Sequence, residues 1–464
     1  MTSTFPTSAD EFYALRDDRT NRMSSSRQYQ DVLCEVRVSA IDAANPATQA
    51  TVLVAANLLS RWCRRVVLNI PPVPIGAGLN AGTGSLAEIV LDQMRDADPF
   101  GRFGMVRMGG DEATLILHIG ENATPVAGCH NVFVTASGWL ATVSKEGPIL
   151  LPDDDKPNWL GATAAACLGV AHLFKAAIGV HSERYLRDGI FDVFELKWID
   201  NPQQAPWPET LNVGNVLLVG AGSVGSSAVF SMRLNRFAGS LTIVDRDFTK
   251  IENFNRSPIF GRKMFGQNKA EALKDYLRGT PLSAMAVPLW WDQFVLERSR
   301  SSFDFDVWLP LANEFGVRLA IQNAVPPLMI HASTTSNWGV NHGRHIPGRD
   351  DCLSDRFPSE VFSEQLACAS GDIDAPGGQV DAALPFTSTF AGMLVAADLV
   401  RSLLPAYPQV PNFALFDWFG MMDIIHAWNR VPRPNCFCRH PSKRLHEMFN
   451  SKTRAYPLFG LIND

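Results

Sequence analysis

The chain has 464 residues, a length that suits about three domains, and its 46% hydrophobic and 19% charged residues are typical of a globular protein. A net charge of −6 without any basic run argues against a nucleic acid as partner. The N-terminus has no signal-peptide pattern and no apolar stretch approaches the ~20 residues of a membrane span, so we expect a cytoplasmic protein without a membrane partner.

Residues 1–199 are predicted to form an N-terminal α/β domain. Helical patterns alternate there with short β-branched runs, which is typical of an α/β sandwich. The glycine-rich segment 76–84 lacks a strand–glycine–helix register and is interpreted as a loop. The predicted helices cover residues 51–63, 86–94 and 159–178, and the predicted strands cover residues 65–70, 113–118 and 131–136.

A proline-rich polar linker, residues 200–210, is predicted to precede a second domain, residues 211–464. That domain opens with the apolar run 216–219, a predicted buried strand, and continues with a helix over 223–237. Three glycines with G-x-G-x-x-G spacing follow the strand: Gly220, Gly222 and Gly225. This spacing is typical of a turn that brings a phosphate close to the N-terminus of a helix, where N–H groups attract an anion.

A second predicted strand, residues 241–244, ends in Asp245. An acidic residue about 20 positions after the last glycine can accept hydrogen bonds from ribose hydroxyls. Taken alone, this unit fits nicotinamide, flavin and adenine nucleotides equally well.

Polar residues beyond Asp245 distinguish between these nucleotides. Asp247, Asn253, Arg256 and Lys269 follow in turn. A dehydrogenase has no use for Arg256 and Lys269 there, whereas an enzyme that cleaves between the α- and β-phosphates must stabilise charge on the leaving pyrophosphate. Arginine grips phosphate with two parallel hydrogen bonds, and lysine contributes a point charge.

The series D-x-D, N-x-x-R and G-x-x-K in residues 245–269 resembles the adenylation domain of ubiquitin-activating enzymes and their bacterial relatives, the ThiF–MoeB family. The resemblance covers about residues 211–440 and implies a Rossmann-like, doubly wound α/β fold that binds ATP and Mg²⁺. Members work as true or pseudo-dimers, and the helical segment 161–175 resembles late helices of such domains. Residues 1–199 are therefore either an inactive adenylation-like half or an unrelated α/β domain.

The family holds Mg²⁺ with an aspartate in a T-D-N sequence that precedes an arginine. The predicted strand 304–311 leads into Asn313 and Glu314, and alignment on Arg318 places Asn313 at the aspartate position. Asparagine offers Mg²⁺ an uncharged oxygen, and Glu314 offers a carboxylate one position away. A solvated turn at the end of the strand is the alternative.

A zinc site is implied near two cysteine-containing segments. The family has a C-x-x-C pair where this chain has Cys352 and Asp355, and the second pair is Cys436 and Cys438. Asp355 or His440 would complete the four ligands of a tetrahedral site. The alternative is a decayed site in which hydrophobic packing has replaced the metal.

Cys368 is the candidate catalytic cysteine, because the family carries its cysteine in a loop, here about residues 359–380, before a helix that resembles residues 391–399. The resemblance implies that Cys368 takes the carboxyl terminus of a modifier as a thioester, or carries a persulfide in sulfur-transfer members. A thiolate is required for either reaction. A buried thiol and a fourth zinc ligand remain the alternatives.

The resemblance implies ATP-dependent adenylation of the C-terminal glycine carboxylate of a ubiquitin-like protein. Thioester formation on Cys368 and transfer to a conjugating enzyme would follow. The N-terminal extension favours a bacterial ubiquitin-like conjugation pathway of the antiphage type. Three alternatives stay open: a sulfur-carrier adenylyltransferase, a nucleotide-binding pseudoenzyme that serves as a scaffold, and an NAD-dependent oxidoreductase.

Overall fold

The computed structural model describes most of the chain. The described residues are 4–21, 28–79, 84–105, 113–179, 188–297, 304–335, 338–356, 384–405, 407–418 and 425–434, together with Cys436 and Cys438.

The N-terminal half is built on a parallel sheet of five strands in the order β3-β2-β1-β4-β5. Short antiparallel strands extend it in a sheet with the order β6-β7-β8-β9. The strands are β1 (Cys34–Val38), β2 (Arg65–Asn69), β3 (Arg102–Gly104), β4 (Leu115–Ile119), β5 (His130–Val134), β6 (Ala136–Ser137), β7 (Leu140–Val143), β8 (Gly189–Asp192) and β9 (Lys197–Ile199). The main helices are α1 (Ala9–Arg16), α2 (Asp18–Asn21), α3 (Pro46–Leu59), α4 (Leu86–Ala97) and α5 (Leu160–Ala177).

The C-terminal half is built on one sheet of eight strands in the order β12-β11-β10-β13-β14-β15-β16-β17. The first five of these pair in parallel and the last three antiparallel. The strands are β10 (Asn212–Val219), β11 (Ala238–Val244), β12 (Leu282–Val287), β13 (Val307–Pro310), β14 (Met329–Thr334), β15 (Gly339–His345), β16 (Phe413–Asp417) and β17 (Ile425–Trp428). The helices are α6 (Ser223–Leu234), α7 (Ile251–Phe254), α8 (Lys269–Tyr276), α9 (Trp291–Glu297), α10 (Phe315–Asn323), α11 (Leu353–Arg356) and α12 (Pro385–Arg401).

The two halves share one topology. In each half the first strand lies in the middle of the parallel sheet, with the next two on one side and the following two on the other. An antiparallel bridge between Phe133 and Ser144 connects β5 to the end of β7, as β14 pairs with β15. A long apolar helix then follows, α5 before β8 and α12 before β16. The predicted doubly wound α/β fold is confirmed. The domain boundaries at residues 199 and 211 stay predictions.

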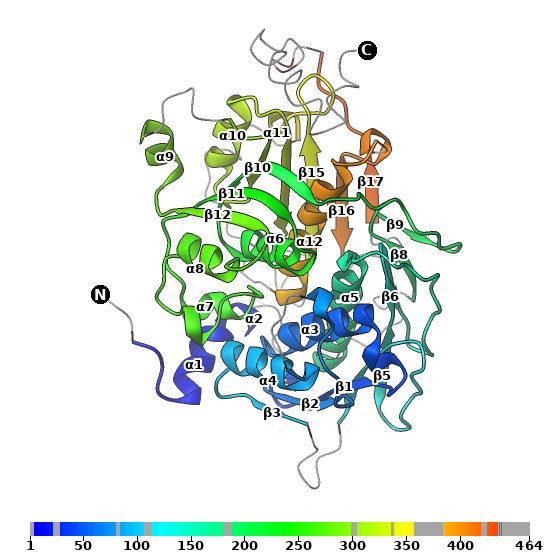
Figure 1. Ribbon diagram of the computed structural model, residues 1–464. Coiled ribbons are helices and arrows are strands. Elements are labelled where there is room, and N and C mark those ends of the chain that lie inside the picture. The colour runs from blue at the N-terminus through cyan, green and yellow to red at the C-terminus, as the bar shows by residue number, and fades with distance from the viewer. Residues whose placement is uncertain are drawn as a thin grey trace.

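The halves meet through four helices that lie between the two sheets (Figure 1). Helix α3 packs on α5, α5 on α12, and α12 on α6. At Gly392 a β-carbon would lie 2.3 Å from the backbone nitrogen of Ala228, so α12 can approach α6 this closely only with glycine there. One continuous hydrophobic core runs from Phe12 to Trp418.

Helix α5 is the one helix of the described chain that is long and apolar enough to cross a membrane. The sequence was expected to contain no such stretch, so that expectation was wrong by length and composition. All of its residues are buried inside the protein, against α3, α12 and the N-terminal sheet. This burial is typical of a core helix, since a helix that is largely apolar on every face is buried on every face.

Several predicted elements lie where expected, with shifted ends. Helix α3 begins at Pro46 rather than residue 51, because the Asn45 side chain accepts hydrogen bonds from the N–H groups of Ala47 and Thr48. The predicted linker is fixed in place, since Gln204 donates hydrogen bonds to the carbonyls of residues 137 and 152. Strands β1 and β15 were missed, because polar residues break up their apolar pattern.

Candidate functional site

The three glycines after β10 have separate structural roles. Gly220 has a φ of +99°, and a β-carbon there would lie 2.4 Å from the backbone nitrogen of Ala312. A β-carbon on Gly225 would lie 2.0 Å from the Gly220 carbonyl oxygen, so this residue lets α6 pack on the turn. Nothing lies within 4 Å of a β-carbon built on Gly222, the N-cap of α6. The predicted turn is present, and its open side at Gly222 faces the two adjoining cavities described below.

Asp245 stabilises the turn and also lines the smaller of the two cavities described below. One carboxylate oxygen accepts a hydrogen bond from the Ala221 N–H at 2.7 Å, and the other accepts one from the Asp247 N–H at 2.8 Å. Burial raises the pKa of Asp245, and nearby Lys269 together with these N–H groups opposes that rise. The carboxylate therefore ties the ends of β10 and β11 together at the position predicted to meet a ribose.

Lys269 is the first residue of α8, and its side chain lies beside Asp247, two residues after Asp245. Its Nζ lies 2.9 Å from a carboxylate oxygen of Asp247, and the Lys269 side chain is 11% exposed while that of Asp247 is 55% exposed. The Asn268 side chain caps α8 and also donates to the carbonyls of residues 245 and 247. The structure thus joins the predicted D-x-D and G-x-x-K residues into one unit.

Arg256 lies on the short segment after α7 and is 8% exposed. Its Nη1 donates to the carbonyl of Glu252 and to the side-chain oxygen of Asn255. Asn253 lines the same cavity, but its side-chain oxygen also accepts from the Lys250 N–H at 2.9 Å and so caps α7. The motif asparagine is therefore a structural cap at the rim of the site.

Asn313 and Glu314 leave the C-terminal end of β13 as predicted. Asn313 is exposed and lines both cavities described below, whereas Glu314 lines only the smaller one and is the N-cap of α10. Arg318 is buried, and its Nε donates to the carbonyl of Ala312 at 2.6 Å. The oxygen donors at Asn313, Glu314 and Asp247 are of the type that Mg²⁺ prefers.

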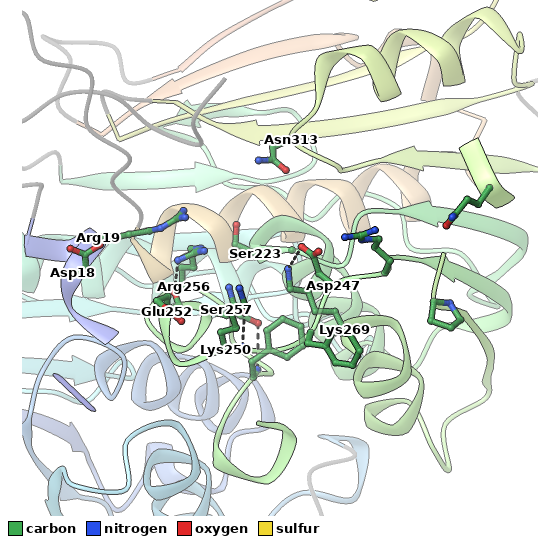
Figure 2. Close-up of a pocket in the computed structure, with 17 residues that line it drawn as sticks. Asp18, Arg19, Ser223, Asp247, Lys250, Glu252, Arg256, Ser257, Lys269 and Asn313 are labelled. Atoms are coloured by element: carbon green, nitrogen blue, oxygen red, sulfur yellow. Dashed lines mark hydrogen bonds and ion pairs between the residues drawn. The ribbon is translucent and has the colours of Figure 1, made fainter. Parts of the chain in front are cut away.

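A cavity of about 840 Å³ opens over the glycine turn (Figure 2). Five basic side chains line it against three acidic ones, so it suits a polyanion such as a triphosphate. The basic residues are Arg19, Arg246, Lys250, Arg256 and Lys269, and the acidic residues are Asp18, Asp247 and Glu252.

A second cavity of about 310 Å³ adjoins the first at Gly222 and Asn313. Its walls are mostly apolar and include Leu289, Trp290 and Val317. The Arg246 guanidinium lies 3.8 Å from the centre of the Trp290 ring. A flat apolar base fits these walls, while the phosphates of the same nucleotide fit the basic cavity.

The sequence did not point to several of these residues. Asp18 and Arg19 come from α2 in the N-terminal segment, on the same side of the cavity as Arg256 (Figure 2). Ser223, Arg246 and Lys250 lie next to motif residues but are not themselves conspicuous. Only the docking of the two halves brings α2 to the cavity, so no local pattern marks Arg19.

The matching turn of the N-terminal half is closed by a side chain. After β1, the Asp42 carboxylate accepts hydrogen bonds from the Ser39 hydroxyl at 2.7 Å and from the Asn122 N–H at 3.0 Å. A β-carbon on Gly120, at the end of β4, would lie 2.4 Å from the Asp42 side chain. The Asp42 carboxylate therefore occupies the space between the turn after β1 and the end of β4.

Three of the predicted metal ligands come together. The sulfur of Cys352 lies 3.0 Å from that of Cys436 and 3.3 Å from that of Cys438, and all three cysteines are buried. The hydrogen bond from Cys352 lowers the pKa of Cys438. His440 lies outside the described residues, and so does Cys368.

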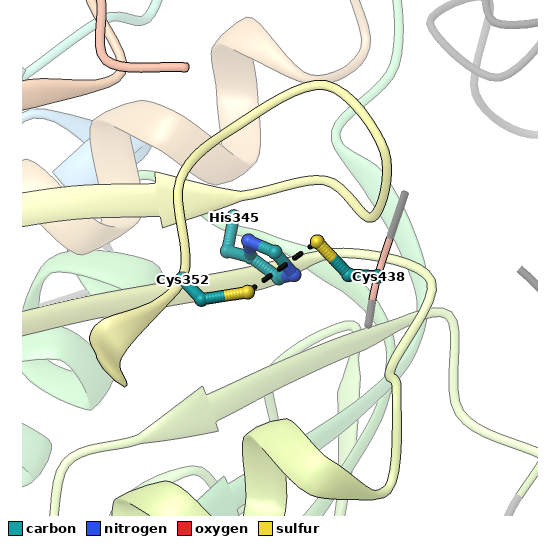
Figure 3. Close-up of side chains that lie close together, drawn as sticks. All are labelled: His345, Cys352 and Cys438. Carbon is teal, nitrogen blue, oxygen red and sulfur yellow. Dashed lines mark hydrogen bonds between the residues drawn. The ribbon is translucent and has the colours of Figure 1, made fainter. Parts of the chain in front are cut away.

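Two further side chains approach the sulfurs. Asp355 is close to Cys352 and Cys436, but its carboxylate also pairs with the Arg433 guanidinium at 3.2 Å. His345, which the sequence did not suggest, has a ring nitrogen within 4.8 Å of the sulfurs of Cys352 and Cys438 (Figure 3). Its Nδ1 lies 3.0 Å from the Asp351 carbonyl, and its Nε2 is buried without a hydrogen-bond partner in the described part of the chain.

Comparisons with known proteins add independent findings. The ThiF family model matches residues 205–439, and the BilD N-terminal domain model matches residues 34–188. The uncharacterized protein y4jF of Sinorhizobium fredii (strain NBRC 101917 / NGR234) is 27% identical over 312 residues, or 65% of this chain and 55% of the relative. The chain therefore spans about half the length of this curated relative. The crystal structure of E. coli MccB with succinimide is 14% identical with a TM-score of 0.37, over 66% of this chain and 97% of that chain.

Proposed function

Because the chain belongs to the ThiF family of adenylyltransferases, we propose that it uses ATP to activate the C-terminal glycine carboxylate of a ubiquitin-like protein. One observation carries the proposal: a basic cavity lies over the glycine turn and adjoins a mostly apolar one. These suit the phosphates and the base of a nucleoside triphosphate. In an NAD-dependent oxidoreductase, Arg256 and Lys269 would have no function, because hydride transfer releases no pyrophosphate.

In the proposed reaction, a carboxylate oxygen of the modifier forms a bond to the α-phosphorus of ATP. The bond from that phosphorus to the bridging oxygen breaks, and pyrophosphate leaves with the electron pair. Arg256 and Lys269 would stabilise the negative charge that develops on the leaving group. Lys269 is paired with Asp247 at 2.9 Å, so it would exchange this partner for phosphate when ATP binds.

Mg²⁺ would be held by the oxygen donors of Asn313 and Asp247, which line both cavities, and of Glu314, which lines only the smaller one. When bound, the ion would neutralise charge on the triphosphate. Asn313 carries no charge, so this chain would rely on the carboxylates of Asp247 and Glu314 more than a family member with aspartate does.

Cys368 would then receive the activated modifier. Its thiolate attacks the acyl carbon of the adenylate, the bond to the phosphate oxygen breaks, and AMP leaves. A conjugating enzyme would take the modifier onward by thioester exchange. A sulfur-carrier adenylyltransferase shares the first step and differs in ending with sulfur transfer.

The match of residues 34–188 to the BilD N-terminal domain supports a place in a bacterial ubiquitin-like conjugation system. We propose that this system serves antiviral defence in the cytoplasm. The shared strand order and the closed turn at Asp42 support an inactive adenylation-like half packed on the active one. On this proposal one chain is a pseudo-dimer.

Pyrophosphate–ATP exchange by the full chain tests the proposal, with small glycine-terminated proteins encoded near its gene as candidate modifiers. Exchange that requires one of these proteins is the expected result. Tight ATP binding without exchange for any candidate would favour the scaffold. An adduct that forms with the modifier, is cleaved by an excess of free thiol through thioester exchange and is absent in Cys368→Ala would separate thioester formation from adenylation.

We also propose a structural zinc ion with Cys352, Cys436, Cys438 and His345 as ligands. Zinc-binding histidines usually donate one ring N–H to a carbonyl and present the other nitrogen to the metal, and His345 is arranged in this way. Zinc analysis of the full chain should find about one ion, retained in Asp355→Ala and His440→Ala and lost or weakened in His345→Ala. If His345→Ala retained its zinc, the fourth ligand would be another residue.

A further inference from the structure

A buried arginine of the N-terminal half makes several hydrogen bonds to the segment that carries Arg256. Arg61 lies just beyond the end of α3 and is 2% exposed. Its Nη1 donates to the carbonyls of Phe254 at 2.7 Å and Phe260 at 2.9 Å. Its Nη2 donates to the carbonyl of Pro258 at 2.9 Å. A single guanidinium therefore spans both sides of Arg256 in the chain.

Asn57, one turn earlier on α3, orients this guanidinium. Its side-chain oxygen accepts from the Arg61 Nε at 2.8 Å, and its Nδ2 donates to the Pro258 carbonyl at 3.0 Å. The planar fork of an arginine fixes the directions of its partners, which a lysine cannot do. Two side chains of the N-terminal half thus define where the backbone of residues 254–260 lies.

The chemistry of this contact is unusual for a purely structural one. The hydrogen-bond partners of Arg61 in the described chain are carbonyl and amide oxygens rather than a carboxylate. Burial lowers the pKa of Arg61 to about 9. A buried charge is costly, and an apolar residue of similar size often stabilises a protein as well or better. What the arginine supplies beyond packing is a defined geometry.

The other contacts of the segment lead to the nucleotide site. Ser257 shares a hydrogen bond of 2.7 Å with Ser226, which lies in the first turns of α6 after Gly222. The Asn255 side chain donates to the Thr20 hydroxyl at 3.2 Å, next to Arg19 of the cavity. The segment is therefore held on one face by the N-terminal half and on the other by the helix of the glycine turn.

We propose that Arg61 is a positioning residue, which sets the place of Arg256 through the backbone of residues 254–260. The inference rests on the proposed function, in that Arg256 is taken to contact the phosphates of ATP. It gives the N-terminal half a defined part in the nucleotide site, although Arg61 itself lines neither cavity.

Binding of ATP with Mg²⁺ to the full chain, measured by titration calorimetry, tests this proposal through a double-mutant cycle. Arg61→Met should weaken ATP binding about tenfold when Arg256 is present, the equivalent of one lost charged hydrogen bond. The same change in an Arg256→Ala background should weaken it less than about twofold, because the residue to be positioned is absent. Equal losses in both backgrounds would overturn the proposal.

Two further variants guard against a simple folding defect. Arg61→Lys keeps the charge but loses the fork, and Asn57→Ala removes the contact that orients Arg61 together with one hydrogen bond to the Pro258 carbonyl. Both should show the same dependence on Arg256, at melting temperatures close to that of the natural chain. Arg95→Met, on the exposed face of α4, is the matched control and should leave ATP affinity unchanged. A lower melting temperature with unchanged ATP affinity would assign Arg61 a structural role only.

The outcomes separate this inference from the proposed function. Modifier-dependent exchange together with equal losses in the cycle refutes only the role of Arg61. If the loss of ATP affinity depends on Arg256 but no candidate modifier gives pyrophosphate exchange, the positioning role of Arg61 is supported and the proposed activation of a modifier is refuted. A natural chain that binds no ATP refutes both.

Discussion

At the scale of single residues, the nucleotide site is held by side chains that each serve two purposes. Asp245 ties two strand ends together and faces the apolar cavity. Asn253 caps α7 and lines the basic cavity. Substitutions at such positions change both stability and binding, so the informative tests use residues with a single role.

Gly220 and Gly222 offer such a pair. Alanine at residue 220 would have to adopt a φ of +99° and approach Ala312 within 2.4 Å, so Gly220→Ala should lower the free energy of unfolding by about 1–3 kcal/mol or more. Alanine at residue 222 meets no protein atom within 4 Å, so Gly222→Ala should leave stability unchanged but weaken ATP binding. Urea unfolding and titration with ATP measure the two effects. Equal stability losses in both variants would contradict the assigned roles.

Lys269 and Lys274 lie on the same helix and differ in their surroundings. Lys269 lines both cavities, whereas Lys274 is 44% exposed and pairs with Glu271. Lys269→Ala should reduce the rate of modifier-dependent pyrophosphate exchange by about 10²–10³-fold, because a charge that stabilises the leaving group is lost. Lys274→Ala should change it less than about twofold, since exposed pairs contribute little. Similar rates for the two variants would remove Lys269 from the reaction.

At the scale of elements, α12 connects the two halves. Asp398 is 2% exposed, and one of its carboxylate oxygens lies 2.9 Å from Nε2 of His342 on β15. Its other oxygen pairs with Arg401, which also donates to the carbonyl of Val193 beyond β8. The helix thus joins the C-terminal sheet to the N-terminal half through one buried polar network.

Asp398→Asn should destabilise the protein by about 3–5 kcal/mol at pH 7, because it leaves Arg401 buried without its counter-charge. Although burial acts to raise it, His342 and Arg401 hold the pKa of Asp398 below its ordinary value. A carboxyl group with a lowered pKa stabilises the folded state above the unfolded pKa of about 3.9 and loses this contribution as the pH falls.

The difference between the natural chain and Asp398→Asn should therefore be full at pH 6–7 and shrink below about pH 4. Urea unfolding across this range measures it. A difference that stays constant down to acid pH would show that packing, not the charge of Asp398, decides the stability of α12.

At the scale of the whole molecule, the two halves form one structural unit despite their separate sheets. The hydrophobic core is continuous between them, and α5 and α12 pack on each other across the interface. The basic cavity takes Arg19 from the first half and Arg256 from the second. The two halves therefore repeat one strand order but share one hydrophobic core.

A fragment of residues 211–464 should accordingly aggregate or remain partly unfolded, since the apolar faces of α6 and α12 would be exposed to water. Size-exclusion chromatography and circular dichroism of the fragment test this expectation. A monomeric, folded fragment that binds ATP as tightly as the full chain would contradict it, and would also limit the part of Arg19 in binding.

The sequence by itself determined the glycine turn, the acidic strand end and the basic residues Arg256 and Lys269. The glycine turn and the acidic strand end belong to one strand–turn–helix–strand unit, so local spacing predicts them. Arg256 and Lys269 lie beyond that unit, and the family resemblance indicated them. The family resemblance also indicated the three cysteines that come together, because the family has a cysteine pair in each of the two segments. Cys368 and His440 stay predictions, since both lie outside the described residues.

Only the tertiary structure decided which distant residues complete these sites. Arg19 lines the same cavity as Arg256, and Arg61 donates hydrogen bonds to the segment around Arg256, although both lie far away in the chain. His345 approaches the cysteines from a strand with no apolar alternation. Local patterns carry no information on such contacts, because they arise when separate faces pack into one core. The buried interface between the two halves thus determines which distant side chains line the cavity, and the local motif determines where the cavity forms.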